Sequence, residues 1–120
     1  MSHLLKLIGK PILDVQTNIS QSVALNDSAF QESKIELFLQ LVFDGYHLNI
    51  YNKFELIGLT SLQYLLLKGK TINNIIESKE NVVFYLNEGI RFILDLRDDA
   101  FIGPEAMCLY GPDNLIVVWN

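Results

Sequence analysis

The Asp44-Gly45 pair, set between two runs of alternating apolar residues, limits the possible folds of this chain more than any other feature. Such a pair favours a two-residue β-hairpin turn of type I′, which needs positive φ at both central residues. The turn also fixes the register of the stretch LFLQLVFDGYHLNIYN, residues 37–52. The expected cross-strand pairs are Phe43 with Tyr46, Leu41 with Leu48 and Leu39 with Ile50. Because all these pairs are apolar, they predict one wall of a β core.

A second hairpin is predicted in residues 82–96, where Asn87-Glu88-Gly89 makes a three-residue turn with Gly89 in the left-handed conformation. The pairs expected on its apolar face are Leu86 with Ile90, Phe84 with Phe92 and Val82 with Leu94.

The segments that precede the two hairpins resemble each other. LIGKPILDV begins at Leu7 and LKGKTINNI begins at Leu67, so that Leu, Gly, Lys and Ile recur 60 positions later. This recurrence predicts an internal repeat of a strand followed by a hairpin, with repeat 1 at about 7–52 and repeat 2 at about 67–96.

The segments outside the hairpins are assigned by local pattern. The first strand is expected at Ile12 to Gln16, and an extra short strand at Val23 to Leu25, followed by a loop. Residues 56–68 predict a connecting helix, because Leu59, Leu62, Leu65 and Leu66 have helical spacing, Thr60 or Ser61 can cap its start, and Gly69 can end it.

The C-terminal segment, residues 97–120, contains two Gly-Pro pairs and then a turn that leads into a final strand, Leu115 to Trp119. The outer face of the second hairpin mixes apolar and charged residues, and the tail is expected to cover it. The whole chain is therefore predicted to be one mainly β (α+β) domain, residues 1–120, an antiparallel sandwich or partly open barrel built from two repeats joined by one short helix.

Composition narrows the class of function. Half of the residues are hydrophobic, and the net charge is −5. Nucleic acid is therefore not expected as a partner, because binding it depends on Lys and Arg. No signal peptide or apolar run of membrane-spanning length is recognised, and the single Cys108 suits a reducing compartment. These features predict a cytoplasmic protein with no membrane partner.

The sequence offers little catalytic machinery. Cys108 and His47 are a nominal nucleophile and base, but Cys108 lies in an apolar run that predicts burial, and nothing in the sequence brings the two together. No metal-binding or phosphate-binding motif is recognised, and no cofactor is expected. The prediction is a binding protein that is not an enzyme.

Acidic residues are concentrated in the last quarter of the chain: Asp95, Asp98, Asp99, Glu105 and Asp113. Such a group can steer a basic protein partner or can simply solvate a loop.

The tail GPEAMCLYGPDNLIVVWN, residues 103–120, together with the preceding DLRDDAF, resembles small acidic bacterial proteins, some of which look like immunity proteins of contact-dependent growth inhibition and related polymorphic toxin systems. The resemblance implies a cytoplasmic inhibitor that neutralises a cognate toxin domain, commonly a nuclease with a basic active site. Within that expectation, the candidate contact residues are Asp95, Asp98, Asp99 and Glu105, with His47 and Tyr51 as further contacts.

Two other functions are compatible with the sequence. The first is a β module that binds a small ligand between the two repeats, for which a hollow interior lined by aromatic residues is expected. The second is a subunit that dimerises through an exposed strand near Trp119. The oligomeric state is expected to be monomer or homodimer.

Overall fold

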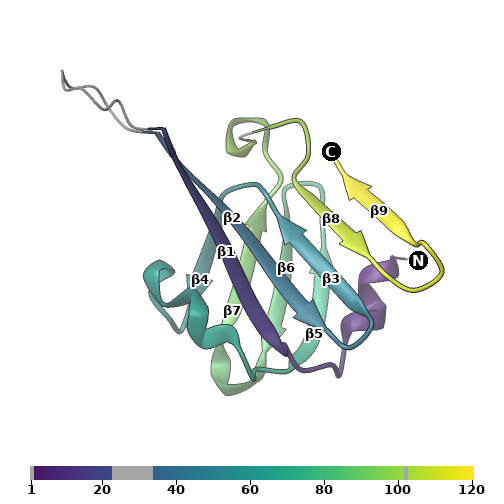
Figure 1. Cartoon of the computed structure of the whole chain (residues 1–120). Helices are drawn as coiled ribbons and strands as arrows, with labels where there is room; N and C mark the ends of the chain where they lie inside the picture. The colour runs from purple at the N-terminus through teal and green to yellow at the C-terminus, as the bar shows by residue number, and fades with distance from the viewer. Residues whose placement is uncertain (1, 23–33, 102) are drawn as a thin grey trace.

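The computed structural model describes residues 2–22, 34–101 and 103–120. Two antiparallel sheets lie face to face in this part of the chain (Figure 1). The first has the strand order β1-β2-β3-β8-β9, and the second has the order β4-β7-β6-β5. The strands are β1 (Asp14–Ser22), β2 (Lys34–Phe43), β3 (Tyr46–Ile50), β4 (Phe54–Ile57), β5 (Ile72–Glu77), β6 (Asn81–Leu86), β7 (Arg91–Asp95), β8 (Met107–Tyr110) and β9 (Ile116–Trp119).

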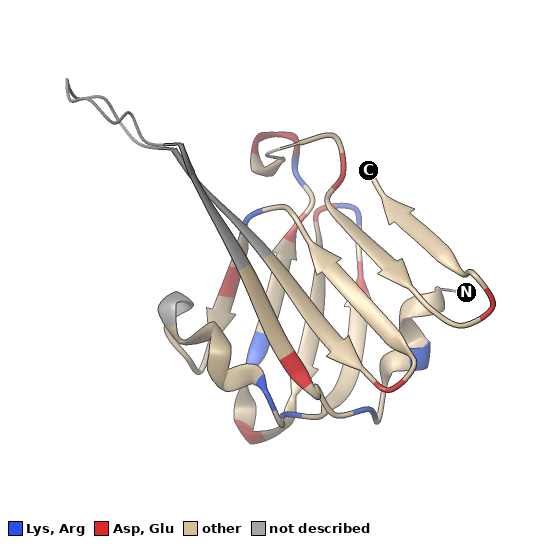
Figure 2. Cartoon of the chain, viewed as in Figure 1, with Lys and Arg blue, Asp and Glu red and all other residues tan. Residues whose placement is uncertain are grey.

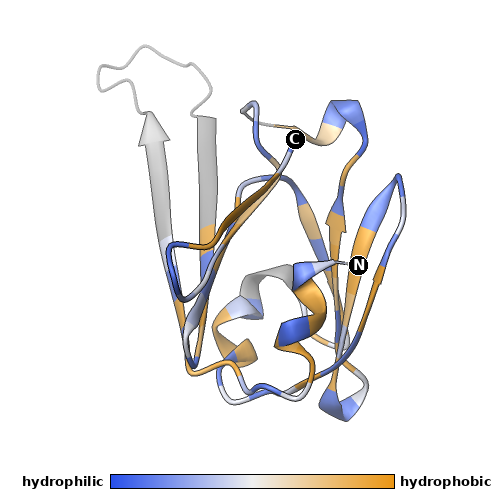
Figure 3. Cartoon of the chain, turned by 90° about the vertical axis from the view of Figure 1, so that its right-hand side faces the viewer, coloured by the Kyte–Doolittle hydropathy of each residue, from blue (hydrophilic) through white to orange (hydrophobic). Residues whose placement is uncertain are grey.

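The helices of the described chain are short 3-10 segments: η1 (His3–Leu7), η2 (Ser61–Leu67), η3 (Asn87–Gly89) and η4 (Asp98–Ala100). η1 contacts β5, and η2 contacts β1 and β4, so the two longer segments pack at opposite sides of the paired sheets. Figure 3, which views the sheets from the side, shows η1 at the near side between them. None of the helices described is long and apolar enough to cross a membrane.

Both predicted hairpins and their registers are confirmed. β2 and β3 pair Leu39 with Ile50, Leu41 with Leu48 and Phe43 with Tyr46. β6 and β7 pair Phe84 with Phe92 and Val82 with Leu94, and the Leu86 N–H donates to the Ile90 carbonyl at 2.8 Å. The core lies between the two sheets because these apolar faces pack against each other.

The turn types differ from the prediction at Asp44-Gly45. Gly45 has φ +82°, but Asp44 does not have positive φ, so this turn is not type I′. Two consecutive residues with positive φ, which a type I′ turn needs, occur instead at Glu88 (+65°) and Gly89 (+73°), between β6 and β7, and at Asp113 (+60°) and Asn114 (+62°), between β8 and β9. Asp and Asn tolerate this conformation because their short polar side chains can hydrogen-bond locally.

Two boundaries differ from the sequence prediction. The first strand runs from Asp14 to Ser22 rather than from Ile12 to Gln16. Pairing with β2 extends the strand through residues 17–22, whose polar composition is typical of a loop. The strand expected at Val23 to Leu25 lies outside the described residues. The segment expected to begin the connecting helix instead forms β4, which pairs with β7, so that only Ser61–Leu67 is helical.

The C-terminal segment also lies elsewhere than expected. Its strands β8 and β9 extend the first sheet beside β3, with Leu48 opposite Leu109, and do not cover the outer face of β6 and β7. The chain therefore crosses between the sheets twice. After β3 it crosses to the second sheet to form β4, and after β7 it crosses back to form β8.

The segments before β1 and β5 meet in a reciprocal hydrogen-bonded pair. Gly9 N–H donates to the Ile72 carbonyl at 2.7 Å, and Gly69 N–H donates to the Ile12 carbonyl at 2.8 Å. Ile12 N–H donates to the Lys70 carbonyl, and Ile72 N–H donates to the Lys10 carbonyl. Each bond thus has a counterpart in which the donor and acceptor segments are exchanged.

Candidate functional site

Carboxylates gather at one end of the paired sheets, where β3, β5, β7 and β9 finish and β4, β6 and β8 begin (Figure 2). We call this the acidic end. Its acidic residues are Glu55, Glu77, Glu80, Asp95, Asp98, Asp99 and Glu105, and its basic residues are Lys53, Lys79 and Arg97. The opposite end is nearly balanced, with Lys6, Lys10, Lys68, Lys70 and Arg91 against Asp14, Asp44, Glu88 and Asp113. The two ends therefore differ in charge.

An ion pair occupies one carboxylate of the acidic end. The Arg97 guanidinium donates to Asp95 from both Nε and Nη2, and Nη2 lies 2.7 Å from Asp95 Oδ2. Hydrogen bonds from this side chain and from the Arg97 backbone N–H lower the pKa of Asp95 to about 2. The pair raises the pKa of Arg97 in turn. Asp95 is therefore ionised and already paired at neutral pH.

A buried asparagine fixes the backbone beneath η4. Asn52 is 2% exposed, and its Nδ2 donates to the Asp95 carbonyl at 2.8 Å. Its backbone N–H donates to the Ala106 carbonyl, and the Lys53 N–H donates to the Ala100 carbonyl. These bonds tie three segments to residues 52–53: the last residue of β7, the last residue of η4 and the residue just before β8. Asn52 Oδ1 has no hydrogen-bond partner in the described chain.

A hollow of about 280 Å³ lies beside the ion pair on the second sheet. Charged residues of both signs line it: Lys53, Glu55, Glu80, Asp95 and Arg97. Phe54, Asn81 and Ile93 complete the lining. The register places Asn81 opposite Asp95 and Glu55 opposite Ile93, so strand pairing alone brings these side chains to one place.

The outer face of the first sheet carries a different set of residues. His47 is exposed and pairs with Val42 on one side and Tyr110 on the other. In the next row Gln40 Nε2 donates to Asn49 Oδ1 at 2.8 Å, and Asn49 Nδ2 donates to the Tyr51 hydroxyl at 3.3 Å. This polar chain crosses the face from β2 to the end of β3.

Cys108 is buried on this same face, opposite Asn49, which confirms its expected burial. Hydrogen bonding with the Cys108 side chain is the main cause that raises the pKa of Tyr110 to about 12, and the charges of Cys108, Tyr51 and Glu105 add to it. The Tyr110 phenol is therefore held in its neutral form.

The structure brings together only some of the six predicted contact residues. Asp95, Asp98 and Asp99 lie within one short segment, and Glu105 follows shortly before β8. Asp98 and Asp99 are exposed, whereas Asp95 is paired with Arg97. Tyr51 follows β3 at the acidic end, and its hydroxyl accepts from Asn49 on the outer face, whereas His47 lies opposite Tyr110 towards the other end of that face. His47 therefore belongs to a different surface from the η4 carboxylates.

The sequence analysis missed the contribution of β4 and of the β5–β6 turn to this end. Glu55 was missed because no strand was predicted at Phe54–Ile57, and Glu80 was missed because it lies in a turn whose position depends on the second sheet. Strand alternation in Phe54–Ile57 was the signal available for Glu55.

Among the described residues, no group of three or more His, Cys, Asp or Glu side chains has the arrangement of a metal site. No protein-family model matches the sequence, and no curated protein or solved structure is significantly similar to it.

Proposed function

We propose that this chain is an immunity-type protein of the cytoplasm, which binds and neutralises a cognate toxin domain through its acidic end. The observation that carries the proposal is the difference in charge between the two ends of the paired sheets. A basic nuclease active site attracts such an end, because complementary charge speeds association and orients the partners.

Asp98 and Asp99 are the residues best placed to make the contact. Both lie exposed in η4, and no ion pair with a described residue occupies either carboxylate. Asp95 serves instead to hold Arg97, and Asn52 holds the backbone that carries η4. The contact surface is therefore presented on a turn with a fixed base, which lowers the ordering cost of binding.

Packing of the interior favours this function over the binding of a small ligand between the sheets. Apolar residues of both sheets and of η2 enclose the space at the centre, and that space has no room for a water molecule. Its lining is Ile12, Leu41, Leu67, Ile72, Phe84, Leu86 and Phe92. A ligand-binding module of the expected kind needs a hollow at this position.

We also propose that the fold is a sandwich of two related units, each a 3-10 helix followed by four strands, with the fourth strands exchanged. β4 of the first unit pairs with β7 of the second, and β8 of the second pairs with β3 of the first. The reciprocal hydrogen bonds between Gly9 and Ile72 and between Gly69 and Ile12 support a pseudo-twofold relation, as does φ +88° at both glycines.

A growth-rescue assay tests the function. The C-terminal region of the polypeptide encoded immediately upstream of this chain is expressed with and without the protein. We expect that region to stop growth and the full chain to restore it. If the region is not toxic, or if it is toxic and the chain gives no rescue, the proposal is wrong.

A matched pair of variants tests the surface. Asp98→Asn with Asp99→Asn is expected to weaken binding to the toxin domain, measured by calorimetry at low salt, by roughly tenfold or more. Asp44→Asn with Asp113→Asn makes the same change in net charge at the opposite end and should leave the affinity unchanged. Equal losses in the two variants would mean that only the total charge matters and would remove the acidic end as the contact.

A further inference from the structure

The free edge of β9 is the least protected sheet edge in the described chain. Proteins usually block such edges with charged side chains, bulges or a covering segment. β5, the edge of the second sheet on the same side, has a register irregularity between Ile72 and Asn74 and contacts η1. β1 and β4, the edges on the other side, contact η2. β9 reads Ile-Val-Val-Trp, with no charge and a regular register against β8.

Backbone alternation shows which groups of β9 are unpaired. The Gly111 N–H donates to the Leu115 carbonyl at 3.0 Å, and the Ala106 N–H donates to the Trp119 carbonyl at 2.7 Å. Consecutive residues of an antiparallel strand direct their N–H and C=O groups to opposite sides. The groups of Ile116 and Val118 therefore point to the free edge, and their side chains are 60% and 40% exposed on the outer face.

We propose that β9 pairs with β9 of a second copy of this chain, antiparallel and about a twofold axis that passes beside Val117. In this register Ile116 of one copy lies opposite Val118 of the other, and the pair exchanges two N–H to O=C bonds. The symmetric pair exchanges two more, so all four unpaired groups of each edge are satisfied. Ile116 and Val118 also form two apolar cross-strand pairs on the outer face.

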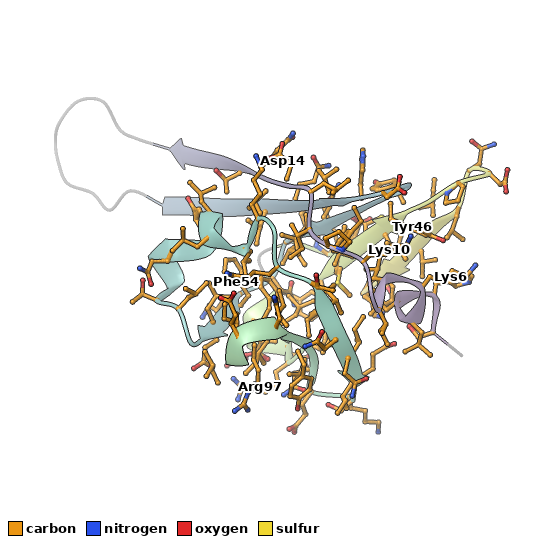
Figure 4. The ribbon with its side chains drawn as sticks, turned by 90° about the horizontal axis from the view of Figure 1, so that it is seen from below. Lys6, Lys10, Asp14, Tyr46, Phe54 and Arg97 are labelled. Carbon is orange, nitrogen blue, oxygen red and sulfur yellow. The ribbon has the colours of Figure 1, made fainter. Side chains whose placement is uncertain are left out.

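Charge at the two ends of β9 favours a second copy in this orientation. Near the start of β9, Lys10 Nζ lies 5.5 Å from the centre of the Tyr46 ring, and that ring packs against Gly111 (Figure 4). At the other end, Trp119 Nε1 donates to Glu77 Oε2 at 3.2 Å. Antiparallel pairing places the Lys10 end of one copy beside the Glu77 end of the other, and it directs the two acidic ends away from each other.

Sedimentation equilibrium of the full chain, from low micromolar to submillimolar concentration, tests the proposal. We expect a monomer–dimer equilibrium. Ile116→Lys should weaken it by roughly tenfold or more, because each copy would place a cation at the paired edge. Ile76→Lys is the matched control, since Ile76 is 50% exposed on the β5 edge, and it should leave the equilibrium unchanged. Circular dichroism checks that both variants fold.

Amide hydrogen exchange supplies a second readout on the unmodified chain. The Ile116 and Val118 amides should become protected as the protein concentration rises, because their N–H groups are bonded only in the dimer. A monomer at every concentration would overturn the proposal. So would a dimer in which these two amides stay unprotected, or one that Ile76→Lys weakens as much as Ile116→Lys does.

Discussion

At the scale of single residues, charge pairing and hydrogen bonding decide which acidic side chains are available. Asp95 was expected to contact a partner, but two nitrogens of Arg97 hold it within the protein. Asp98 and Asp99, three and four residues later, remain exposed on η4. The sequence shows the same carboxylate type at all three positions, and only the local geometry separates a structural role from an exposed one.

The Asp95–Arg97 pair predicts a pH dependence of stability. The folded-state pKa of Asp95 is lowered from 3.8 to about 2, so its contribution is fully present above the unfolded value and is lost as pH falls through about 2. Asp95→Asn should therefore be less stable than the parent chain at neutral pH. Urea unfolding should show this difference shrinking as pH falls from 3.8 towards 2.

The Asp44→Asn variant provides the control, because Asp44 lies in the exposed turn between β2 and β3. Its stability should follow that of the parent chain over the same pH range. If Asp95→Asn remains less stable than the parent chain by the same amount when the pH reaches about 2, the lost stability does not come from the ionised carboxylate.

At the scale of elements, the two segments that contain Gly9 and Gly69 are built alike. A hydrogen bond closes the C-terminal turn of each 3-10 helix, from Ile8 N–H to the Leu5 carbonyl and from Lys68 N–H to the Leu65 carbonyl. A glycine at φ +88° then redirects the chain towards the next strand. Glycine suits this position because other residues pay a steric cost in the left-handed region.

Replacement of these glycines should have the same effect in both halves. Gly9→Ala and Gly69→Ala should each destabilise the fold by about 1–2 kcal/mol, because an alanine is strained at this φ although its Cβ would meet no atom within 4 Å. Thermal unfolding measures the loss. Gly103→Ala, at a position with ordinary φ and open space, should change stability little. Clearly unequal losses at Gly9 and Gly69 would contradict the proposed relation between the halves.

At the scale of the whole molecule, an aromatic cluster supports the packing of the two sheets. Phe92 stacks on Phe54 with ring centres 4.9 Å apart and meets Phe84 edge to face at 5.7 Å. These rings come from β7, β4 and β6, and Phe84 and Phe92 are almost fully buried. The cluster thus includes β4, the strand that the chain forms after it crosses from the first sheet to the second.

Loss of the central ring should destabilise the whole fold. Phe92→Ala is expected to lower the free energy of unfolding by about 3–5 kcal/mol, because it leaves a cavity that the surrounding strands cannot fill. Urea denaturation measures the change. Tyr85→Ala, on the outer face of the neighbouring strand β6, should cost much less, since this ring is partly exposed. Similar losses in the two variants would show that the cluster does not dominate the core.

The sequence by itself determined the two hairpins, their registers and the apolar faces that form the core. These features depend on residues close together in the chain: turn residues such as Gly45 and Gly89 set the pairing, and period-two alternation sets the face. The last strand, at Ile116 to Trp119, was predicted nearly to its boundaries for the same reason.

Only the tertiary structure decided where β4, β8 and β9 pair, how far β1 extends and which carboxylates meet. β4 is four residues long and carries a weak local signal, so its conformation depends on the hydrogen bonds that β7 offers. The gathering of Glu55, Glu80 and Asp95 around one hollow requires three segments distant in sequence to be placed by sheet pairing. Local sequence patterns carry no information about such pairing, because it depends on interactions between segments that are far apart in the sequence.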